Sequence, residues 1–359
     1  MDKVQTCVQV LQKRMDDGDL FFKAQMPSER RLTEELGVSR TTIRKALKIL
    51  LDQGVLFREG RRKARIRELC EKDERAPTIA FLAPAVFSSD HNLWWEGVVT
   101  ALEGMNVVLR PCSYLHFTDP RIHEALASHD ALFFMPLAQK VPDWLVNKMR
   151  ESSCRVAVLD QDQSQQGFVS VQLFPPSAGV KLLDHLRAFG HRCIDCLNTQ
   201  GEDTVIQERV STWQAYLAEH GLQGVLRSRP TNRPLAGAYD YVSQLLREGH
   251  LLGTALFCTT GPCAIGAMRA LKDAGLEVGR DVSVCAVNDE GLGRYLYTSL
   301  AALESPPRSH YLRRVVDWMI SGKSWRGPLL VRPGDVPLFE GESVGPAPAD
   351  GRSTAAPTP

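Results

Sequence analysis

Apolar residues near the start of the chain recur at helical spacing. Val4, Val8, Leu11 and Met15 fall on one face of a first helix that we expect to end near Gly18. A second helix is predicted after Ser28, whose side chain can accept a hydrogen bond from a free backbone N–H at the helix start. Its apolar side would be formed by Leu32 and Leu36, and Gly37 would end it in a left-handed conformation.

A third helix is predicted two residues later, with Ser39 as its cap. Its apolar stripe occupies positions i, i+3, i+4, i+7 and i+8, as expected for a helix packed on a core. The stripe consists of Ile43, Ala46, Leu47, Leu50 and Leu51. The opposite face is basic and hydroxylated, and it carries Arg40, Thr41, Thr42, Arg44, Lys45 and Lys48. Such a face suits the major groove of DNA, where Arg can bond a guanine edge and Thr a base or a phosphate.

A strand and a basic hairpin follow the third helix. Val55 to Phe57 is predicted to be a strand, and the segment Arg58–Arg65 (REGRRKAR) a hairpin loop that turns at Gly60. Helix-turn-helix followed by a basic wing predicts a winged-helix domain.

These residues resemble the amino-terminal signature of the GntR family of regulators over roughly one fifth of the chain. The matching positions are Pro27-Ser28-Glu29-Arg30, Leu36-Gly37-Val38-Ser39-Arg40, Thr42, Arg44, Ala46-Leu47, Leu50 and Gly54. The exposed face, the wing and the resemblance together imply DNA contacts from Arg30, Ser39, Arg40, Thr41, Thr42, Arg44, Lys45, Gly60, Arg61 and Arg62. The alternative for a basic run alone is a solvated surface.

The remainder of the chain has a different pattern, in which short apolar runs alternate with predicted amphipathic helices. The run Thr78–Leu82 predicts a strand buried on both faces, and similar runs recur up to Val282–Val287. Such alternation predicts βαβ units and parallel sheets. Two halves of similar size favour a two-lobed α/β body with a cleft between the lobes. We therefore expect a winged-helix domain at residues 1–66, a linker at 67–77, the two-lobed domain at 78–340 and a disordered tail at 341–359.

The body resembles the effector-binding domain of the LacI/GalR regulators and the periplasmic sugar-binding proteins, so the whole chain is similar to the arabinose-repressor subgroup of GntR proteins. The matching motifs are Leu186-x-x-x-Gly190-His191-Arg192-x-Ile194, Arg209 before a Thr-Trp pair, Ala264-Ile265-Gly266-Ala267-x-x-Ala270-Leu271, Asp281-Val282-Ser283-Val284 and Asn288-Asp289. If the resemblance holds, the chain crosses between lobes near Val171 and again near Asn288.

The resemblance implies an effector pocket between the lobes. Arg209 matches an arginine that binds ligand hydroxyls, and its planar guanidinium suits a diol or a carboxylate. Asn288 stands where relatives usually have an aspartate, and Asp289 either compensates for that change or caps the next turn. Phe87 and Trp95 follow the first strand, where an aromatic ring can stack on a sugar. For these pocket residues ligand binding and simple packing are equally compatible with the sequence.

Charge and composition narrow the possible functions. The net charge of the chain is +1, but residues 28–67 contain twelve Lys/Arg and five Asp/Glu, so a basic head precedes a slightly acidic body. The Cys193-x-x-Cys196 pair has no partner pair at metal spacing, so free thiols are expected and no metal or cofactor. A redox function of this pair is the alternative. We find no signal-peptide pattern, no membrane span and no arrangement of nucleophile, base and orienting residue. These features predict a cytoplasmic protein that is not an enzyme.

The sequence thus predicts a transcriptional regulator, expected to be a repressor, that binds a near-palindromic DNA operator as a homodimer. A small molecule, a sugar or sugar derivative, would control it from the cleft between the lobes. Two alternatives stay open. One is a cytosolic small-molecule-binding protein without DNA binding, and the other is a regulator whose degenerate pocket has lost its effector.

Overall fold

The computed structural model describes residues 3–16, 27–57, 65–66, 76–86 and 88–348. The chain divides into two units, which we call the head (Met1–Ala76) and the body (Pro77–Pro359). Gly60, Arg61, Arg62 and Phe87, which carry predicted roles, lie outside the described residues. No helix in the described part is both long and apolar enough to cross a membrane.

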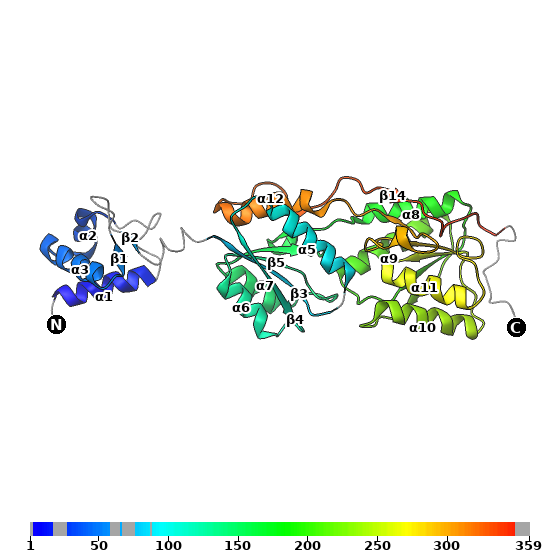
Figure 1. The fold of residues 1–359 in the computed structure, drawn as a ribbon, viewed down its shortest axis with the longest axis horizontal. Helices are drawn as coiled ribbons and strands as arrows, with labels where there is room; N and C mark the ends of the chain where they lie inside the picture. Colours follow the sequence, from blue (N-terminus) through cyan, green and yellow to red (C-terminus); the bar gives the residue numbers. More distant parts are fainter. Residues whose placement is uncertain (1–2, 17–26, 58–64, 67–75, 87, 349–359) are drawn as a thin grey trace. The chain divides into compact units, whose positions relative to one another are not determined.

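The head contains the three predicted helices and a short strand pair (Figure 1). The helices are α1 (Lys3–Asp16), α2 (Glu29–Leu36) and α3 (Arg40–Asp52), and β1 (Leu56–Phe57) pairs antiparallel with β2 (Arg65–Ile66). The predicted caps are present, because the Ser28 and Ser39 hydroxyls accept from the amides of Arg31 (3.3 Å) and Thr42 (3.2 Å). Gly37 ends α2 with a positive φ of 65°.

The core of the head is formed mainly by residues of the predicted stripes. Leu11 of α1, Leu32 of α2 and Ile43 of α3 are fully buried. On α1 the buried positions are Cys7, Val8 and Leu11, whereas Val4 and Met15 at the ends of the predicted stripe are half-buried. The two strands and the helix-turn-helix therefore confirm the winged-helix fold.

The first lobe of the body, which we call lobe 1, is an all-parallel sheet with helices on both faces (Figure 1). Its order is β13 (Leu330–Val331), β7 (Val169–Val171), β6 (Arg155–Leu159), β5 (Ala131–Phe134), β3 (Thr78–Pro84), β4 (Val108–Tyr114). Helices α6 (Pro120–Ser128) and α7 (Asp143–Glu151) cover one face. Helices α5 (Ser89–Leu102) and α12 (Arg308–Ser321) pack against each other on the other face.

Lobe 2 repeats this plan, with one antiparallel edge strand. Its order is β14 (Leu338–Phe339), β12 (Ala301–Leu303), β11 (Ser283–Ala286), β10 (Ala255–Cys258), β8 (Ile194–Asn198), β9 (Leu226–Ser228). Helices α8 (Pro176–Ala188) and α9 (Thr204–His220) lie on one face, and α10 (Pro234–Arg247) and α11 (Gly261–Asp273) on the other. The fold confirms the predicted two-lobed α/β body with parallel sheets.

The chain passes between the lobes at places that only partly match the prediction. It leaves lobe 1 after β7 and enters lobe 2 at α8, as expected near Val171. The predicted second crossing near Asn288 is wrong, because β11 before it and β12 after it belong to the same sheet. The chain returns to lobe 1 between Leu303 and Arg308, and it crosses again between β13 and β14.

The predicted disordered tail begins too early. Ser343 is fully buried, and its hydroxyl donates to the Val284 carbonyl at 2.6 Å. The Gly345 carbonyl lies 3.1 Å from Nε2 of the buried His191, and Val344 is also buried. The small residues of this segment led to the prediction of disorder. In the structure they instead fill a narrow space beside β11. Residues 349–359 lie outside the described part of the chain.

Candidate DNA interface and interlobe site

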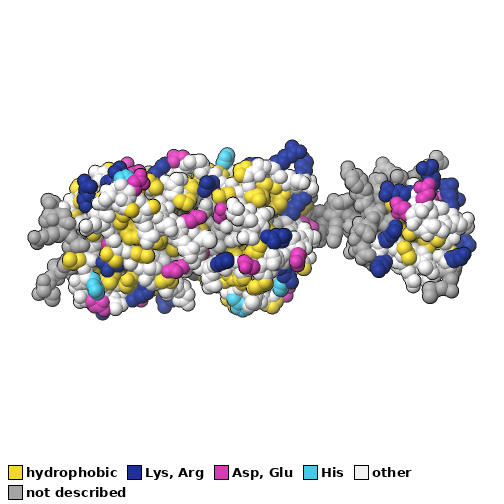
Figure 2. All heavy atoms as spheres, turned by 180° about the vertical axis from the view of Figure 1, so that it is seen from behind, with side chains coloured by type: hydrophobic (Ala, Val, Ile, Leu, Met, Phe, Trp, Pro, Cys, Tyr) yellow, Lys and Arg dark blue, Asp and Glu magenta, His cyan; other side chains and the backbone are white. Residues whose placement is uncertain are grey.

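The third helix of the head presents the predicted polar face to solvent. Arg40, Thr41, Arg44 and Lys45 are exposed on α3, and Thr42 is half-buried beside the Ser39 hydroxyl, with 2.8 Å between their oxygens. Figure 2 shows Lys and Arg side chains gathered on the visible face of the head. The structure thus places guanidinium, ammonium and hydroxyl groups together at the start of one helix, an arrangement that is chemically suited to a DNA groove.

Glu29 holds two of these arginines in place. Its Oε2 accepts from Nε of Arg40 at 3.0 Å and from Nε of Arg44 at 2.9 Å. Burial tends to raise the pKa of Glu29, but the two hydrogen bonds and the charges of the guanidinium groups outweigh it and lower that pKa. The bonds use Nε and leave the terminal nitrogens of both guanidinium groups for a partner. Arg30 pairs instead with Glu34 at 3.5 Å and is largely exposed.

The second site lies in the body, where the carboxyl ends of strands from both sheets meet. Ligands of open α/β sheets bind at these ends, at the point where the strand order reverses. Asp90 follows β3, and Asp160 comes directly after β6. Asp203 follows β8 as the N-cap of α9, and Glu290 follows β11. We call these four carboxylates, together with Arg209, Thr260, Asn288 and Arg308, the interlobe site.

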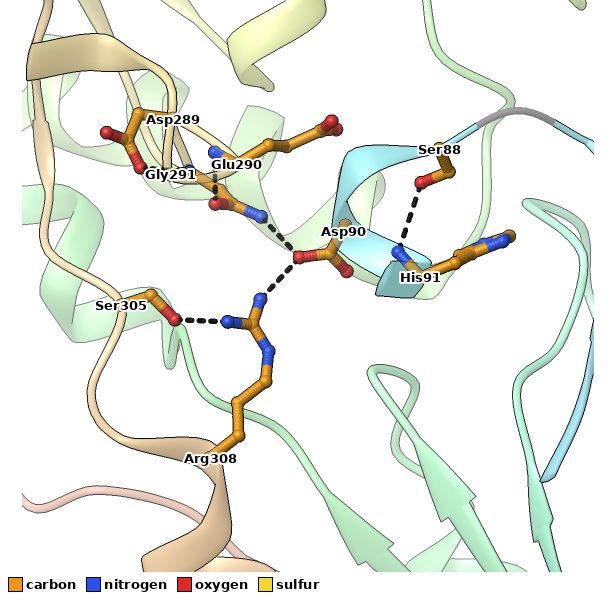
Figure 3. Close-up of polar contacts among 9 residues, drawn as sticks. Ser88, Asp90, His91, Asp289, Glu290, Gly291, Ser305 and Arg308 are labelled. Carbon is orange, nitrogen blue, oxygen red and sulfur yellow. Dashed lines mark hydrogen bonds and ion pairs between the residues drawn. The ribbon is translucent and has the colours of Figure 1, made fainter. Parts of the chain in front are cut away.

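Asp90 connects the two lobes through hydrogen bonds. Its Oδ1 accepts from the Arg308 guanidinium of α12 at 2.6 Å and from Nδ2 of Asn288, in lobe 2, at 3.2 Å (Figure 3). Arg308 also donates to the Ser305 hydroxyl at 2.9 Å, and its guanidinium lies 5.2 Å from the ring of the buried Trp94. Because Arg308 is the first residue of α12, this pair forms where the chain returns to lobe 1.

Further polar contacts join the lobes. Nε2 of Gln161 donates to Oδ2 of Asp203 at 3.4 Å, and Nε2 of Gln172 donates to Glu208 at 3.3 Å. Burial raises the pKa of Asp203, against the backbone amides of α9 and the charge of Arg209, which lower it.

Two carboxylates of the site have raised pKa values, so their ionised forms are disfavoured in the folded protein. Burial, and then the charge of Asp90, raise the pKa of Asp160 to about 7. Burial, and then the charges of Asp90 and Asp160, raise the pKa of Glu290 to about 7. Asp160 (φ 68°) and Glu290 (φ 51°) are also the two non-glycine residues with positive φ in the described part of the chain. Such backbone strain persists where the surrounding structure enforces it, and it clusters at functional sites.

Arg209 is buried in the site, with 7% of its surface exposed. One terminal nitrogen donates to the Thr259 carbonyl at 2.8 Å, but Nε has no hydrogen-bond partner among the described residues. The Thr260 hydroxyl, on a residue equally buried, has no partner there either. Buried donors are almost always paired in native proteins, so these two point to a missing acceptor.

The other predicted effector contacts have different outcomes. Asn288 is in the site, where it contacts Asp90. Asp289 accepts from the amides of Gly291 (2.9 Å) and Gly293 (3.0 Å), which is the turn-capping alternative. The structure does not bring Trp95 together with Arg209, because its ring packs edge-on against Phe81 at 5.6 Å, in a surface pocket formed with β4.

Sequence reasoning missed the four carboxylates of the site, Asp90, Asp160, Asp203 and Glu290, as well as Thr260 and Arg308. Asp160, Thr260 and Glu290 could have been found, since each follows the carboxyl end of a predicted strand closely. Arg308 carried no such signal. Cys193 and Cys196 form no disulfide bond with any residue that the structure describes, and Cys196 is buried.

Two family models match the chain. Residues 3–66 match "Bacterial regulatory proteins, gntR family", and residues 183–322 match "Periplasmic binding protein-like domain". Among curated relatives, the lactose operon repressor of Escherichia coli (strain K12) is 29% identical over 163 residues, which cover 43% of this chain and 45% of the relative. The probable HTH-type transcriptional repressor ExuR of Bacillus subtilis (strain 168) is 23% identical, with 50% of this chain and 53% of the relative covered. The matches thus span about half the length of these relatives.

Solved structures show the same fold. A lac repressor dimer bound to operator and the anti-inducer ONPF superposes with a TM-score of 0.65 at 19% identity, covering 77% of this chain and 98% of that one. A sugar-binding transcriptional regulator of the LacI family from Escherichia coli, complexed with phosphate, gives 0.60 at 20% identity, with 77% and 100% covered. At this level of identity the likeness establishes the fold.

Proposed function

From a chain that joins a GntR-type helix-turn-helix domain to a periplasmic-binding-protein-like domain, we propose a cytoplasmic transcriptional repressor that binds operator DNA through α3. The observation that carries the proposal is the exposed row on α3, in which one carboxylate, Glu29, orients Arg40 and Arg44 together. A surface that merely keeps the protein soluble needs no such shared anchor. The names of the relatives, a lactose operon repressor and ExuR, support the same reading.

The contacts divide by chemistry. Arg40 and Arg44 keep their terminal nitrogens available, so we assign them to base edges, which Arg binds in bidentate fashion. Arg30, Ser39, Thr41, Thr42 and Lys45 are assigned to phosphates, which position the helix without reading sequence. Gly60, Arg61 and Arg62 remain proposed contacts of the wing.

The body is proposed to control the head. A small molecule bound at the interlobe site would change how the lobes are held together, since Asp90, Arg308 and Asn288 connect both lobes at this point. We propose that two chains bind as a homodimer, so that the operator is near-palindromic with half-sites about one or two helical turns apart. We propose Arg209 and Asn288 as effector contacts, because both belong to the interlobe site. The contacts of Trp95 with Phe81 and of Asp289 within its turn do not support a role in ligand binding. Phe87 lies outside the described residues and stays a prediction.

The test is DNA binding by the full chain, measured by fluorescence anisotropy with a duplex selected from a random library. Arg40→Ala and Arg44→Ala should each weaken binding by about tenfold to a hundredfold, because a bidentate base contact contributes about 1–3 kcal/mol. Arg247→Ala is the matched control, since Arg247 is an exposed arginine on α10 in lobe 2. Equal affinities for all four proteins would refute the proposed interface.

Salt titration of the same complexes separates the two kinds of contact. Lys45→Ala should reduce the slope of log affinity against log salt by about 0.9, because one phosphate contact is lost. Its effect should be the same for the selected duplex and for random DNA. A change in sequence preference on replacing Lys45 would overturn its assignment to a phosphate.

A further inference from the structure

The interlobe site is rich in negative charge. It contains four carboxylates, from Asp90, Asp160, Asp203 and Glu290, and two guanidinium groups, from Arg209 and Arg308. Arg308 is already paired with Asp90 at 2.6 Å. Asp203 accepts from Gln161 and from the amide of Ile206, which caps α9. The charge of Asp160 and Glu290 is therefore the part of the site that the protein itself leaves least compensated.

The Asp160 carboxylate has no hydrogen bond or ion pair to any other residue that the structure describes. The charged groups that act on it are Asp90 of α5, Asp203 and Arg209 of α9, and Arg308 of α12. Glu290 is acted on by Asp90, Asp160 and Arg308, and its carboxylate lies near the backbone amide of Asp90. The carboxylates thus repel one another across the junction of the lobes. A positive group placed among them would remove this repulsion.

A bare metal ion does not fit this arrangement. In the part of the chain that the structure describes, no three Asp, Glu, His or Cys side chains come close enough to hold one metal ion. The carboxylates are near enough to influence one another electrostatically, yet too far apart to chelate. An organic cation with some length suits that spacing better than an ion with short coordination distances.

The unpartnered donors indicate which other groups the ligand should carry. Arg209 Nε and the Thr260 hydroxyl, each on a side chain more than nine-tenths buried, require acceptor oxygens. Hydroxyl oxygens supply such acceptors without adding charge. A carboxylate or phosphate on the ligand would also satisfy Arg209, but it would bring another negative charge close to Asp160 and Asp203. A ligand with uncharged oxygens at one end and a cation at the other would match both the unpartnered donors and the uncompensated carboxylates.

We propose that the effector is an aminated polyol, such as an amino sugar, whose ammonium group binds between Asp160 and Glu290 and whose hydroxyl oxygens accept from Arg209 and Thr260. This inference rests on the proposed function, because it names the effector class of the same site. It separates this chain from a receptor for neutral sugars, and also from a receptor for sugar acids.

The experiment is isothermal titration calorimetry of the full chain with matched sugars. Three sets are used, built on glucose, galactose and mannose, and each contains the neutral sugar, its 2-amino derivative and its uronic acid. In at least one set the amino sugar should bind about tenfold or more tightly than both partners at neutral pH, a difference of about 1.4 kcal/mol. Preference for a neutral or acidic member overturns the proposal, and so does binding by none of the nine.

Variants show where the preference arises. Asp160→Asn should abolish the tenfold preference, so that the amino sugar and the neutral sugar bind with similar affinities. Asp240→Asn removes the same charge from an exposed position on α10 and should change neither value. If Asp160→Asn keeps the preference while its melting curve shows a folded protein, the ammonium does not bind there, and the proposal is wrong.

The pH profile gives an independent readout. The affinity for the amino sugar should be bell-shaped, because Asp160 and Glu290 take up protons on the acid side and the amine loses its proton on the alkaline side. The neutral sugar should show a flat profile. A flat amino-sugar profile contradicts the proposal.

DNA binding measured on the same preparations keeps the two proposals apart. Failure to bind any selected duplex would refute the proposed function, whatever the calorimetry shows. Normal DNA binding without amino-sugar preference would refute this inference alone.

Discussion

Replacing Asp160 by asparagine should stabilise the empty body. The folded structure raises the pKa of this carboxyl from its ordinary 3.8 to about 7, through burial and then the charge of Asp90. Each pKa unit corresponds to about 1.4 kcal/mol, so the ionised Asp160 costs the folded state up to about 4 kcal/mol. Asparagine has nearly the same shape and no charge. Because the charge of Asp160 also contributes to the raised pKa of Glu290, the variant should bring the pKa of Glu290 closer to its ordinary value.

The sign of the pH dependence follows from the raised pKa. Between about pH 4 and pH 7 the folded state keeps a proton that the unfolded chain has released, so the free energy of unfolding falls as pH rises through this window. The stabilisation by Asp160→Asn should therefore be close to zero near pH 4. It should grow to a few kcal/mol above about pH 7 and then stay constant.

Urea denaturation followed by tryptophan fluorescence can measure this in the full chain. All six Trp residues lie between positions 94 and 325, so the signal reports on the body alone. Asp240→Asn serves as the control, because an exposed surface change should stay within about 0.5 kcal/mol at every pH. If Asp160→Asn gives no gain at pH 8, or destabilises the body there, the carboxylate is not strained by burial and charge as argued above.

Three further substitutions test other parts of the structure. Glu29→Gln should lower the ratio of affinities for a selected duplex and for random DNA, since the common acceptor of Arg40 and Arg44 loses its negative charge; an unchanged ratio would contradict its positioning role. His191→Phe should destabilise the body by about 3 kcal/mol in urea, because partners of the buried imidazole at 2.9 to 3.1 Å lose their hydrogen bonds; a change below about 0.5 kcal/mol would show that they find others. Gly97→Ala should destabilise the body by about 1–3 kcal/mol, since its new Cβ would meet the Arg308 Cβ at 2.6 Å; unchanged stability would show that α5 and α12 separate freely.

The head was predictable from sequence because its determinants are local. Each helix carries its own cap and apolar stripe, and the Ser28 and Ser39 caps act on residues three positions away. The resemblance to GntR proteins then indicated the face that we propose to contact DNA. What could not be predicted is the pairing of Glu29 with Arg40 and Arg44, because it joins residues on two different helices.

The body was predictable as an alternation of strands and helices, but its ending was not. The helix that carries Arg308, the return to lobe 1 and the packing of Ser343 depend on partners far away in sequence. Arg308 pairs with Asp90 across 218 positions, and Ser343 bonds Val284 across 59. The direction of the Trp95 side chain could not be predicted from the sequence either. Its place after the first strand was read correctly, but the direction of a side chain on a helix depends on which face the sheet covers, and that face packs on Phe81.

The free energy that the ionised Asp160 costs the folded body is large enough to influence a change between two arrangements of the lobes. To move a two-state equilibrium from 1:99 to 99:1, a ligand must favour one state by about 5.5 kcal/mol. The ionised Asp160 alone costs the empty body up to about 4 kcal/mol, and burial and the charges of Asp90 and Asp160 raise the pKa of Glu290 as well. An ammonium group that removes this cost only when both carboxylates surround it would bind one arrangement of the lobes far better than another. Asp160 projects from lobe 1 and Glu290 from lobe 2, so that preference acts directly on the junction that Asp90 holds. A neutral sugar could fill the same space and bond Arg209, but without a charge it would leave the repulsion in place and switch the body weakly.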